Sequence, residues 1–282
     1  MKRLFERATR EQWNVGIVRL TPREAIAVGI VENVTWHPPF AGGWVADPMA
    51  HVVDGTVHVL AERMRIDTDK GYIAALSFDG KRWNGQRLAI DTGCHASYPY
   101  VFSYDDKLYC VPETFEANEV RLYRCEHFPD RWEFQSTLLH DIDAVDSTIF
   151  EHDGRWWLFC TTSDASAHRL LIFHAPTPLD GWLPHARNPV KVDVRNSRPA
   201  GAPFTVDGVL YRPAQDNSRT YGGRIAINRI GVLTAADFAE ETVAYLEPDA
   251  HSEYGSALHT LSFAGDYAVI DGKRMRLAMR RS

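Results

Sequence analysis

Four acidic side chains recur at related places along the chain: Asp47, Glu62, Glu113 and Asp146. Like charges held close together raise one another's pKa, so at least one such carboxyl group should keep a proton near neutral pH. Cleavage of a glycosidic bond needs one carboxylate and one carboxylic acid. The same groups could instead bind a sugar by accepting hydrogen bonds from its hydroxyls, and Asp47 and Asp146 could simply cap the turns before their strands.

Two arginines and a histidine accompany these acids. Arg198 and Arg212 stand in the phrases SRPAG and YRPAQD. They could be counter-ions of the carboxylates, or they could bind a carboxylate or phosphate of the ligand, since a planar guanidinium matches such anions. His259 could bind a central cation, or it could be a core histidine with its hydrogen bonds satisfied.

These side chains flank five segments that each predict a β-hairpin. In each, a turn of Asp-Gly type separates two short apolar runs, because Asp and Gly tolerate the positive φ that tight turns need. The turn residues Asp54, Asp105, Asp153, Asp207 and Gly265 are separated by 51, 48, 54 and 58 residues. The hairpins span 52–62, 103–113, 151–161, 205–215 and 262–272. An all-β repeat of this kind is typical of propellers, and five units predict five blades around one axis.

The same repeat predicts which side chains face that axis. Before the turns, equivalent positions hold Asp47, Tyr98, Asp146, Arg198 and His259. After the turns, equivalent positions hold Glu62, Glu113, Thr161 and Gln215. Because a hairpin's entry and exit lie at the same end, we expect both rows to meet at one mouth of the central channel.

The rest of the chain predicts the outer part of each blade. Two further strands should follow each hairpin, and Trp83, Trp132 and Trp182 recur there as expected inter-blade core. At the N-terminus we expect a short helix at roughly 2–12 and then a strand from NVGIVRL that closes the ring with the last blade. The prediction is a single domain, 1–282, with blades formed by about 30–275.

Composition excludes several classes of partner. The chain has 282 residues, a hydrophobic fraction of 45% and a formal net charge of −6. The one basic run is the tail KRMRLAMRRS, so we expect no nucleic acid and no acidic membrane surface as partner. No apolar stretch approaches the roughly 20 residues of a membrane span.

The N-terminal residues show no secretory signal, and four cysteines without a CxxC spacing predict free thiols: Cys94, Cys110, Cys125 and Cys160. We therefore expect a cytoplasmic monomer or dimer.

Three segments resemble the five-bladed furanosidase-type propeller of glycoside hydrolase family 43, which includes arabinanases and xylosidases. ADP (46–48) resembles the motif of the catalytic base, and VDSTIFEHDGRWWLF (145–159) the segment whose aspartate tunes the acid. ALHTLSFAGDYAVIDG (257–272) resembles the segment whose histidine faces a channel cation, often calcium. The chain departs from that family in blade four, where Arg198 replaces the general-acid Glu, so Glu113 or Glu62 becomes the candidate acid.

A more specific set of motifs spans roughly residues 12–272: QWNVGI, ADP, SYPYVF, PET, VDST, EHDGRWWLF, SRPAG and YRPAQD. This set resembles the propeller found in the N-terminal region of plant glucosamine inositolphosphorylceramide transferases and in bacterial sugar-modifying proteins. The resemblance implies the same fold, with the transferase chemistry in another domain.

Together these observations predict an all-β, five-bladed β-propeller that acts on a sugar-containing small molecule or glycan. As an enzyme it would cleave or transfer a glycosyl group, with catalytic residues Asp47, Glu113 and Asp146. The residues expected to hold the substrate are Glu62, Tyr98, Arg198, Arg212, Gln215 and Asp216. No cofactor is expected to be required, although His259 could face a channel cation such as calcium. The alternative is a non-catalytic recognition module for a glycan or sugar metabolite, partnering a glycosyl- or formyl-transferase.

Overall fold

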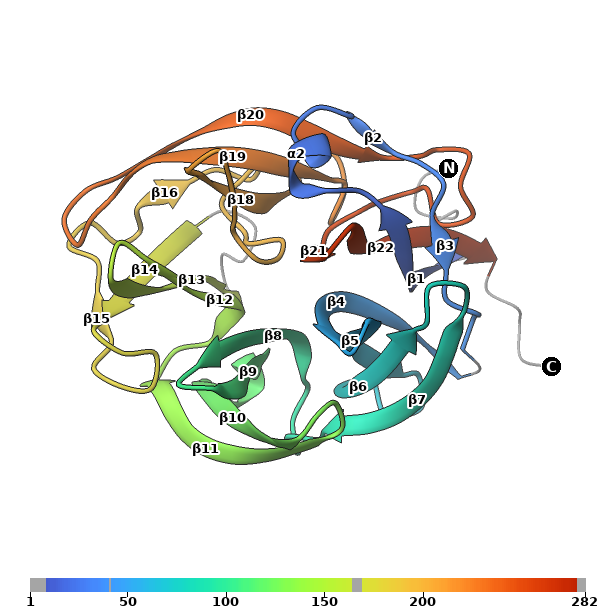
Figure 1. Cartoon of the computed structure of the whole chain (residues 1–282), viewed down its shortest axis with the longest axis horizontal. Coiled ribbons are helices and arrows are strands. Elements are labelled where there is room, and N and C mark those ends of the chain that lie inside the picture. The colour runs from blue at the N-terminus through green and yellow to red at the C-terminus, as the bar shows by residue number, and fades with distance from the viewer. Residues whose placement is uncertain (1–8, 41, 164–168, 278–282) are drawn as a thin grey trace.

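Five antiparallel sheets surround one axis in the computed structural model, which describes residues 9–40, 42–163 and 169–277 (Figure 1). The first blade holds β4 (Gly43–Val53), β5 (Thr56–Arg65), β6 (Lys70–Phe78) and β7 (Trp83–Ile90). The second holds β8 (Ser97–Tyr104), β9 (Lys107–Glu113), β10 (Glu119–His127) and β11 (Arg131–His140). The third holds β12 (Ala144–His152), β13 (Arg155–Thr162), β14 (Arg169–Ala175), β15 (Leu183–Pro184) and β16 (Lys191–Val192).

The fourth blade holds β17 (Phe204–Val206), β18 (Val209–Asp216), β19 (Arg224–Leu233) and β20 (Phe238–Pro248), and β2 (Ile30–Val31) pairs with its rim. The fifth holds β21 (Leu261–Ala264), β22 (Tyr267–Leu277), β1 (Thr9–Arg19) and β3 (Thr35–Trp36). The described helical segments include α2 (Pro22–Ala25) and a 3-10 turn at Phe115–Ala117. Each predicted hairpin forms the inner strands of one blade, so the five-bladed propeller is confirmed.

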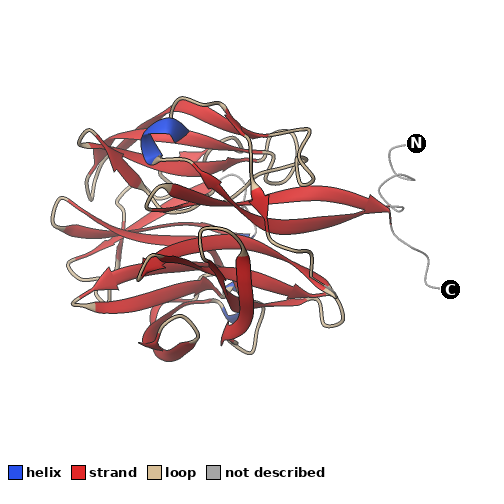
Figure 2. Cartoon of the chain, turned by 45° about the vertical axis from the view of Figure 1, so that its right-hand side comes forward, coloured by secondary structure: helices blue, strands red, loops and turns tan. Residues whose placement is uncertain are grey.

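The N-terminal strand closes the ring. β1 pairs with β22 along its whole length, from Thr9 opposite Leu277 to Arg19 opposite Tyr267. Figure 2 shows this pair extending beyond the other sheets toward the two chain ends. The predicted helix at 2–12 is wrong for residues 9–12, because their backbone groups pair with β22 instead. The rest of that prediction lies outside the described residues.

The tryptophans that recur in the sequence lie between blades, as predicted. Trp83 packs in one cluster with Val15 and Ile17 of β1, and so joins the first blade to the fifth. Trp132 packs with Leu60 and Ile73, and so joins the second blade to the first. Trp182 is partly buried against the cluster between the second and third blades. No helix within the described ranges has the length and apolar character that crossing a membrane requires.

The inner strands β4, β8 and β12 each contain a β-bulge at the candidate site. The register shifts just after Ala46, Ser97 and Val145, which lie opposite Glu62, Glu113 and Thr161. The two predicted rows therefore meet at the same end of each hairpin.

At these bulges the backbone adopts the left-handed conformation, which residues with a Cβ atom rarely adopt. The next residue in each strand has positive φ: 53° at Asp47, 40° at Tyr98 and 54° at Asp146. This region is costly for residues other than glycine and is concentrated at functional sites, where bulges re-aim side chains.

Candidate active site

Buried carboxylates link one blade to the next through the N–H groups of the bulges. Asp271 Oδ2 accepts a hydrogen bond from the backbone N–H of Asp47 at 3.0 Å. Asp47 Oδ2 accepts from the N–H of Tyr98 at 3.4 Å, and Glu113 Oε2 accepts from the N–H of Asp146 at 3.0 Å. Each bulge thus directs its N–H toward an acid of the preceding blade, and the acids gather around the axis.

The fourth blade contributes donors to the same cluster. Arg198 Nε donates to Asp146 Oδ2, and Gln215 Nε2 donates to the same oxygen at 2.9 Å. The backbone N–H of Gln215 also donates to the carbonyl of Arg198 at 2.8 Å, which holds the two residues together. The predicted residues Asp47, Glu113, Asp146, Arg198 and Gln215 therefore do converge.

His259 lies between two carboxylates. Its Nε2 lies 3.3 Å from Asp47 Oδ1, and its Nδ1 lies 2.7 Å from Asp271 Oδ2, without the alignment of a hydrogen bond. Burial lowers the pKa of His259, but the charges of Asp271 and Asp47 outweigh it and raise the pKa above its ordinary value. An imidazolium ion carries a single positive charge, so it would offset part of the negative charge that the two acids share.

Asp47, His259 and Asp271 form a group whose donor atoms could hold a metal ion, since these atoms lie within 4.8 Å of one another. Calcium takes six to eight oxygen ligands, so Asp47, Asp271 and His259 would supply only part of its shell. Because both ring nitrogens of His259 face carboxylates, the geometry suits a counter-ion better than a metal ligand. The predicted calcium role of His259 stays a prediction.

The acids of the cluster differ in their affinity for protons. Burial raises the pKa of Glu113 to about 8, with a further rise from the charge of Asp146 and an opposing effect of Arg198. Burial raises the pKa of Asp47 to about 6, against the opposing charge of His259. Burial and the charges of Asp47 and Glu113 raise the pKa of Glu62 well above its ordinary range. The pKa of Glu113 therefore lies above that of Asp47, and environments that separate the pKa values of two carboxyl groups are typical of acid–base sites.

Residues 27–256 match the family described as "Glucosamine inositolphosphorylceramide transferase 1, N-terminal". The chain belongs to this family. The relative of that name from Oryza sativa subsp. japonica is 34% identical over 265 residues, which cover 86% of this chain and 35% of the rice protein. The one from Arabidopsis thaliana is 34% identical over 210 residues, which cover 72% of this chain and 27% of that protein. The chain thus spans about a third of the length of these relatives.

Solved glycoside hydrolases share the fold of this family member. The catalytic domain of the Coprinopsis cinerea GH62 α-L-arabinofuranosidase superposes with a TM-score of 0.58 at 15% identity, covering 80% of this chain and 79% of that one. CoXyl43, a β-xylosidase/α-arabinofuranosidase from a compost microbial metagenome, gives 0.56 at 14% identity, covering 87% and 94%. At such low identity the likeness concerns the fold alone.

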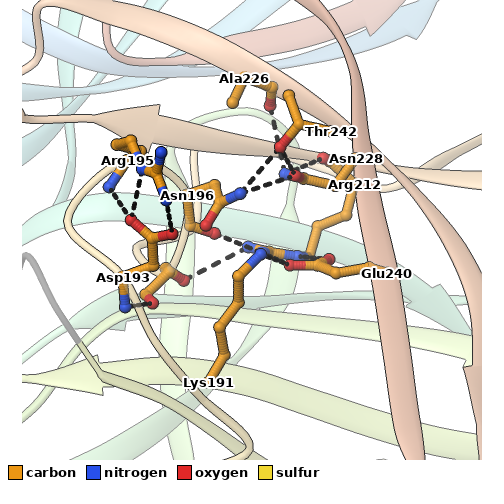
Figure 3. Close-up of polar contacts among 10 residues, drawn as sticks. Lys191, Asp193, Arg195, Asn196, Arg212, Ala226, Asn228, Glu240 and Thr242 are labelled. Carbon is orange, nitrogen blue, oxygen red and sulfur yellow. Dashed lines mark hydrogen bonds and ion pairs between the residues drawn. The ribbon is translucent and has the colours of Figure 1, made fainter.

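Two predicted substrate-binding residues of this transferase-family propeller, Arg212 and Asp216, form ion pairs outside the cluster. Arg212 Nη2 lies 2.6 Å from Glu240 Oε1 and donates to the carbonyl of Asn196, as Figure 3 shows. Asp216 accepts from Arg224 Nε at 2.8 Å. Both stand an odd number of positions from Gln215, so alternation along β18 directs them to the opposite face of the strand.

The hydroxyl of Tyr98 is also occupied. It lies 2.9 Å from Thr148 Oγ1 and accepts the N–H of Gly201 at 2.7 Å, in a fully buried position. These contacts join the second, third and fourth blades. The Tyr98 hydroxyl is therefore engaged in contacts between blades, and its predicted contact with substrate stays a prediction.

Three residues of the site escaped the sequence analysis: Asp271, His95 and Tyr221. Asp271 interrupts the apolar strand YAVIDG, a signal that could have identified it. His95 Nδ1 accepts the N–H of Gly71 at 3.1 Å, which leaves Nε2 to face Glu62 Oε1 at 3.4 Å. Tyr221 comes from the segment after β18 and lies beside Arg198, with the guanidinium carbon 5.3 Å from the ring centroid.

Proposed function

We propose that this propeller acts on a sugar-containing substrate and cleaves or transfers a glycosyl group where Asp47, Glu113 and Asp146 converge. The observation that carries the proposal is the gathering of buried acids at the bulges, where Glu113 accepts the N–H of Asp146 and Asp47 accepts the N–H of Tyr98. Burial raises the pKa of both acids, to about 8 for Glu113 and about 6 for Asp47. Pairs of carboxyl groups whose environments separate their pKa values are typical of acid–base sites. The names of the relatives and the glycoside hydrolase fold support a carbohydrate as substrate.

Each residue has a distinct role in this proposal. Glu113 is the general acid that protonates the leaving oxygen, and Asp47 is the general base or nucleophile. Asp146 tunes the acid, because its charge raises the pKa of Glu113 and its N–H fixes the Glu113 carboxyl group. Arg198 and Gln215 hold Asp146 in place and present polar groups to the substrate.

A second function is favoured by how deeply the acids are buried. Asp47 and Glu113 are each only 6% exposed and Asp146 is 1% exposed. Asp47 and Glu113 also hold backbone N–H groups, and Asp146 holds the side-chain donors of Arg198 and Gln215. A network of this kind could fix the shape of a binding surface without turnover. The propeller would then be a sugar-recognition module serving a transferase, consistent with relatives that extend well beyond the matched region.

One experiment separates these functions. The wild-type chain is incubated with a panel of aryl glycosides and sugar nucleotides, and product release is followed by chromatography, with calorimetry on the same compounds. Release of product supports the enzyme, whereas binding without product supports the recognition module. If no compound is bound or converted, both proposals are wrong.

A further inference from the structure

We propose that Tyr221 is the platform on which the sugar ring of the substrate stacks, an inference that rests on the proposed function. Tyr221 belongs to residues 217–223, the segment that connects β18 to β19 in the fourth blade. None of the hairpin rows includes it.

The Tyr221 ring lies among the side chains of the candidate site. Its centroid lies 5.3 Å from the guanidinium carbon of Arg198 and 5.4 Å from the ring of His259, which it meets edge-on. It also meets the ring of Trp13 edge-on at 6.1 Å.

Tyr221 is also the part of this cluster that solvent reaches most easily. It is 43% exposed, whereas Trp13 and His259 are buried. A tyrosine presents a broad apolar face together with a polar tip. The C–H face of a sugar ring can stack on the apolar face of the tyrosine, while the sugar hydroxyls bind nearby polar groups. Ligand sites commonly combine aromatic walls with a few polar contacts in this way.

The backbone holds Tyr221 in position. Its carbonyl accepts a hydrogen bond from Lys273 Nζ at 3.1 Å, and the next residue, Gly222, donates its N–H to Asn217 Oδ1 at 2.6 Å. Gly222 has φ of 62°, and a Cβ there would lie 2.7 Å from the Cβ of His259. The segment is therefore fixed closely against His259, and a platform fixed in advance costs less ordering on binding.

The variants Tyr221→Ala and Tyr221→Phe test the inference, with Tyr267→Ala as matched control. Tyr267 has the guanidinium carbon of Arg19 at 5.2 Å from its ring centroid and meets Phe78 edge-on at 6.1 Å, so its surroundings resemble those of Tyr221. It lies at the turn of the β21–β22 hairpin, the end opposite to His259 and Asp271. A cooperative thermal unfolding transition is the check that each variant is folded.

The probe is the neutral methyl glycoside, chosen from gluco, galacto, manno, xylo and arabino forms, that binds wild type most tightly by calorimetry. Tyr221→Ala should weaken its binding at least about tenfold, in line with aromatic stacking of ring ligands, while Tyr221→Phe and Tyr267→Ala stay within about threefold of wild type. Wild-type affinity in Tyr221→Ala, with binding still lost in Arg198→Ala, would overturn the platform and leave the proposed function standing. If wild type binds none of the glycosides, the proposed function fails and the platform fails with it.

Discussion

The Oε2 atom of Glu113 accepts a hydrogen bond from the backbone N–H of Asp146 at 3.0 Å, across the boundary between the second and third blades. The bulge in β12 makes this contact possible, because positive φ at Asp146 turns its N–H away from the strand partner. The carboxyl group of Glu113 and the backbone of Asp146 are therefore fixed relative to each other.

Protonation of Glu113 should make stability depend on pH. Burial raises its pKa from 4.5 to about 8, so between these values the folded chain holds a proton that the unfolded chain releases. The stability due to this group is thus fully present below about pH 4.5 and is lost as the pH rises toward 8. The melting temperature of Glu113→Gln, measured relative to wild type, should rise from about pH 5 to about pH 8 and then level off. Glu151→Gln, which changes an exposed acid, is the control. A melting-temperature difference between Glu113→Gln and wild type that stays constant with pH would contradict a buried, protonated Glu113.

Tyr98→Phe should destabilise the fold by about 1–3 kcal/mol, because it leaves the N–H of Gly201 without its acceptor. Urea unfolding measures this cost, with the neighbouring Tyr100→Phe as control. Since the hydroxyl faces Thr148 and Gly201, sugar affinity should change little. Full stability together with lost affinity would instead favour direct contact with the substrate.

Arg212→Ala should destabilise strongly, by about 3–5 kcal/mol, because the buried Glu240 carboxylate loses its main partner and keeps only Lys191. Replacing both partners, as in Arg212→Met with Glu240→Leu, should cost less than the single change. Chemical denaturation of the three proteins tests this order. A folded, fully stable Arg212→Ala chain with reduced sugar affinity would restore Arg212 to the binding site.

Removal of divalent cations with EDTA should leave the melting temperature unchanged, since the structure gives His259 two carboxylate partners of its own. Thermal scans before and after chelation, with calcium added back, measure the effect. A calcium-dependent gain in melting temperature would show that Asp47, His259 and Asp271 hold a cation that stabilises the folded state.

The hairpin repeat was sufficient to predict the five blades and the convergence of the acids. Each tight turn determines which two strands pair, and therefore which of their ends lie together. Arg212 and Asp216 share a motif with Gln215 but lie on the other face of β18, because side chains alternate along a strand. Their partners Glu240 and Arg224 come from other strands, and the motif itself does not reveal them. Asp271 was missed because it lies two positions before the expected row. Tyr221 reaches the site from a connecting segment whose path depends on contacts with Lys273 and Leu258, which no local pattern encodes.

The central claim is that Asp47 performs chemistry on a sugar. Asp47→Asn keeps the shape of the side chain but removes the charge that a base or nucleophile needs, whereas Asp207→Asn changes an exposed acid in a turn of the fourth blade. Steady-state kinetics on the best substrate of wild type should show kcat reduced at least about a hundredfold in Asp47→Asn, with substrate affinity little changed and Asp207→Asn like wild type. Unchanged turnover in a folded Asp47→Asn protein would contradict the assignment of this cluster as a catalytic site.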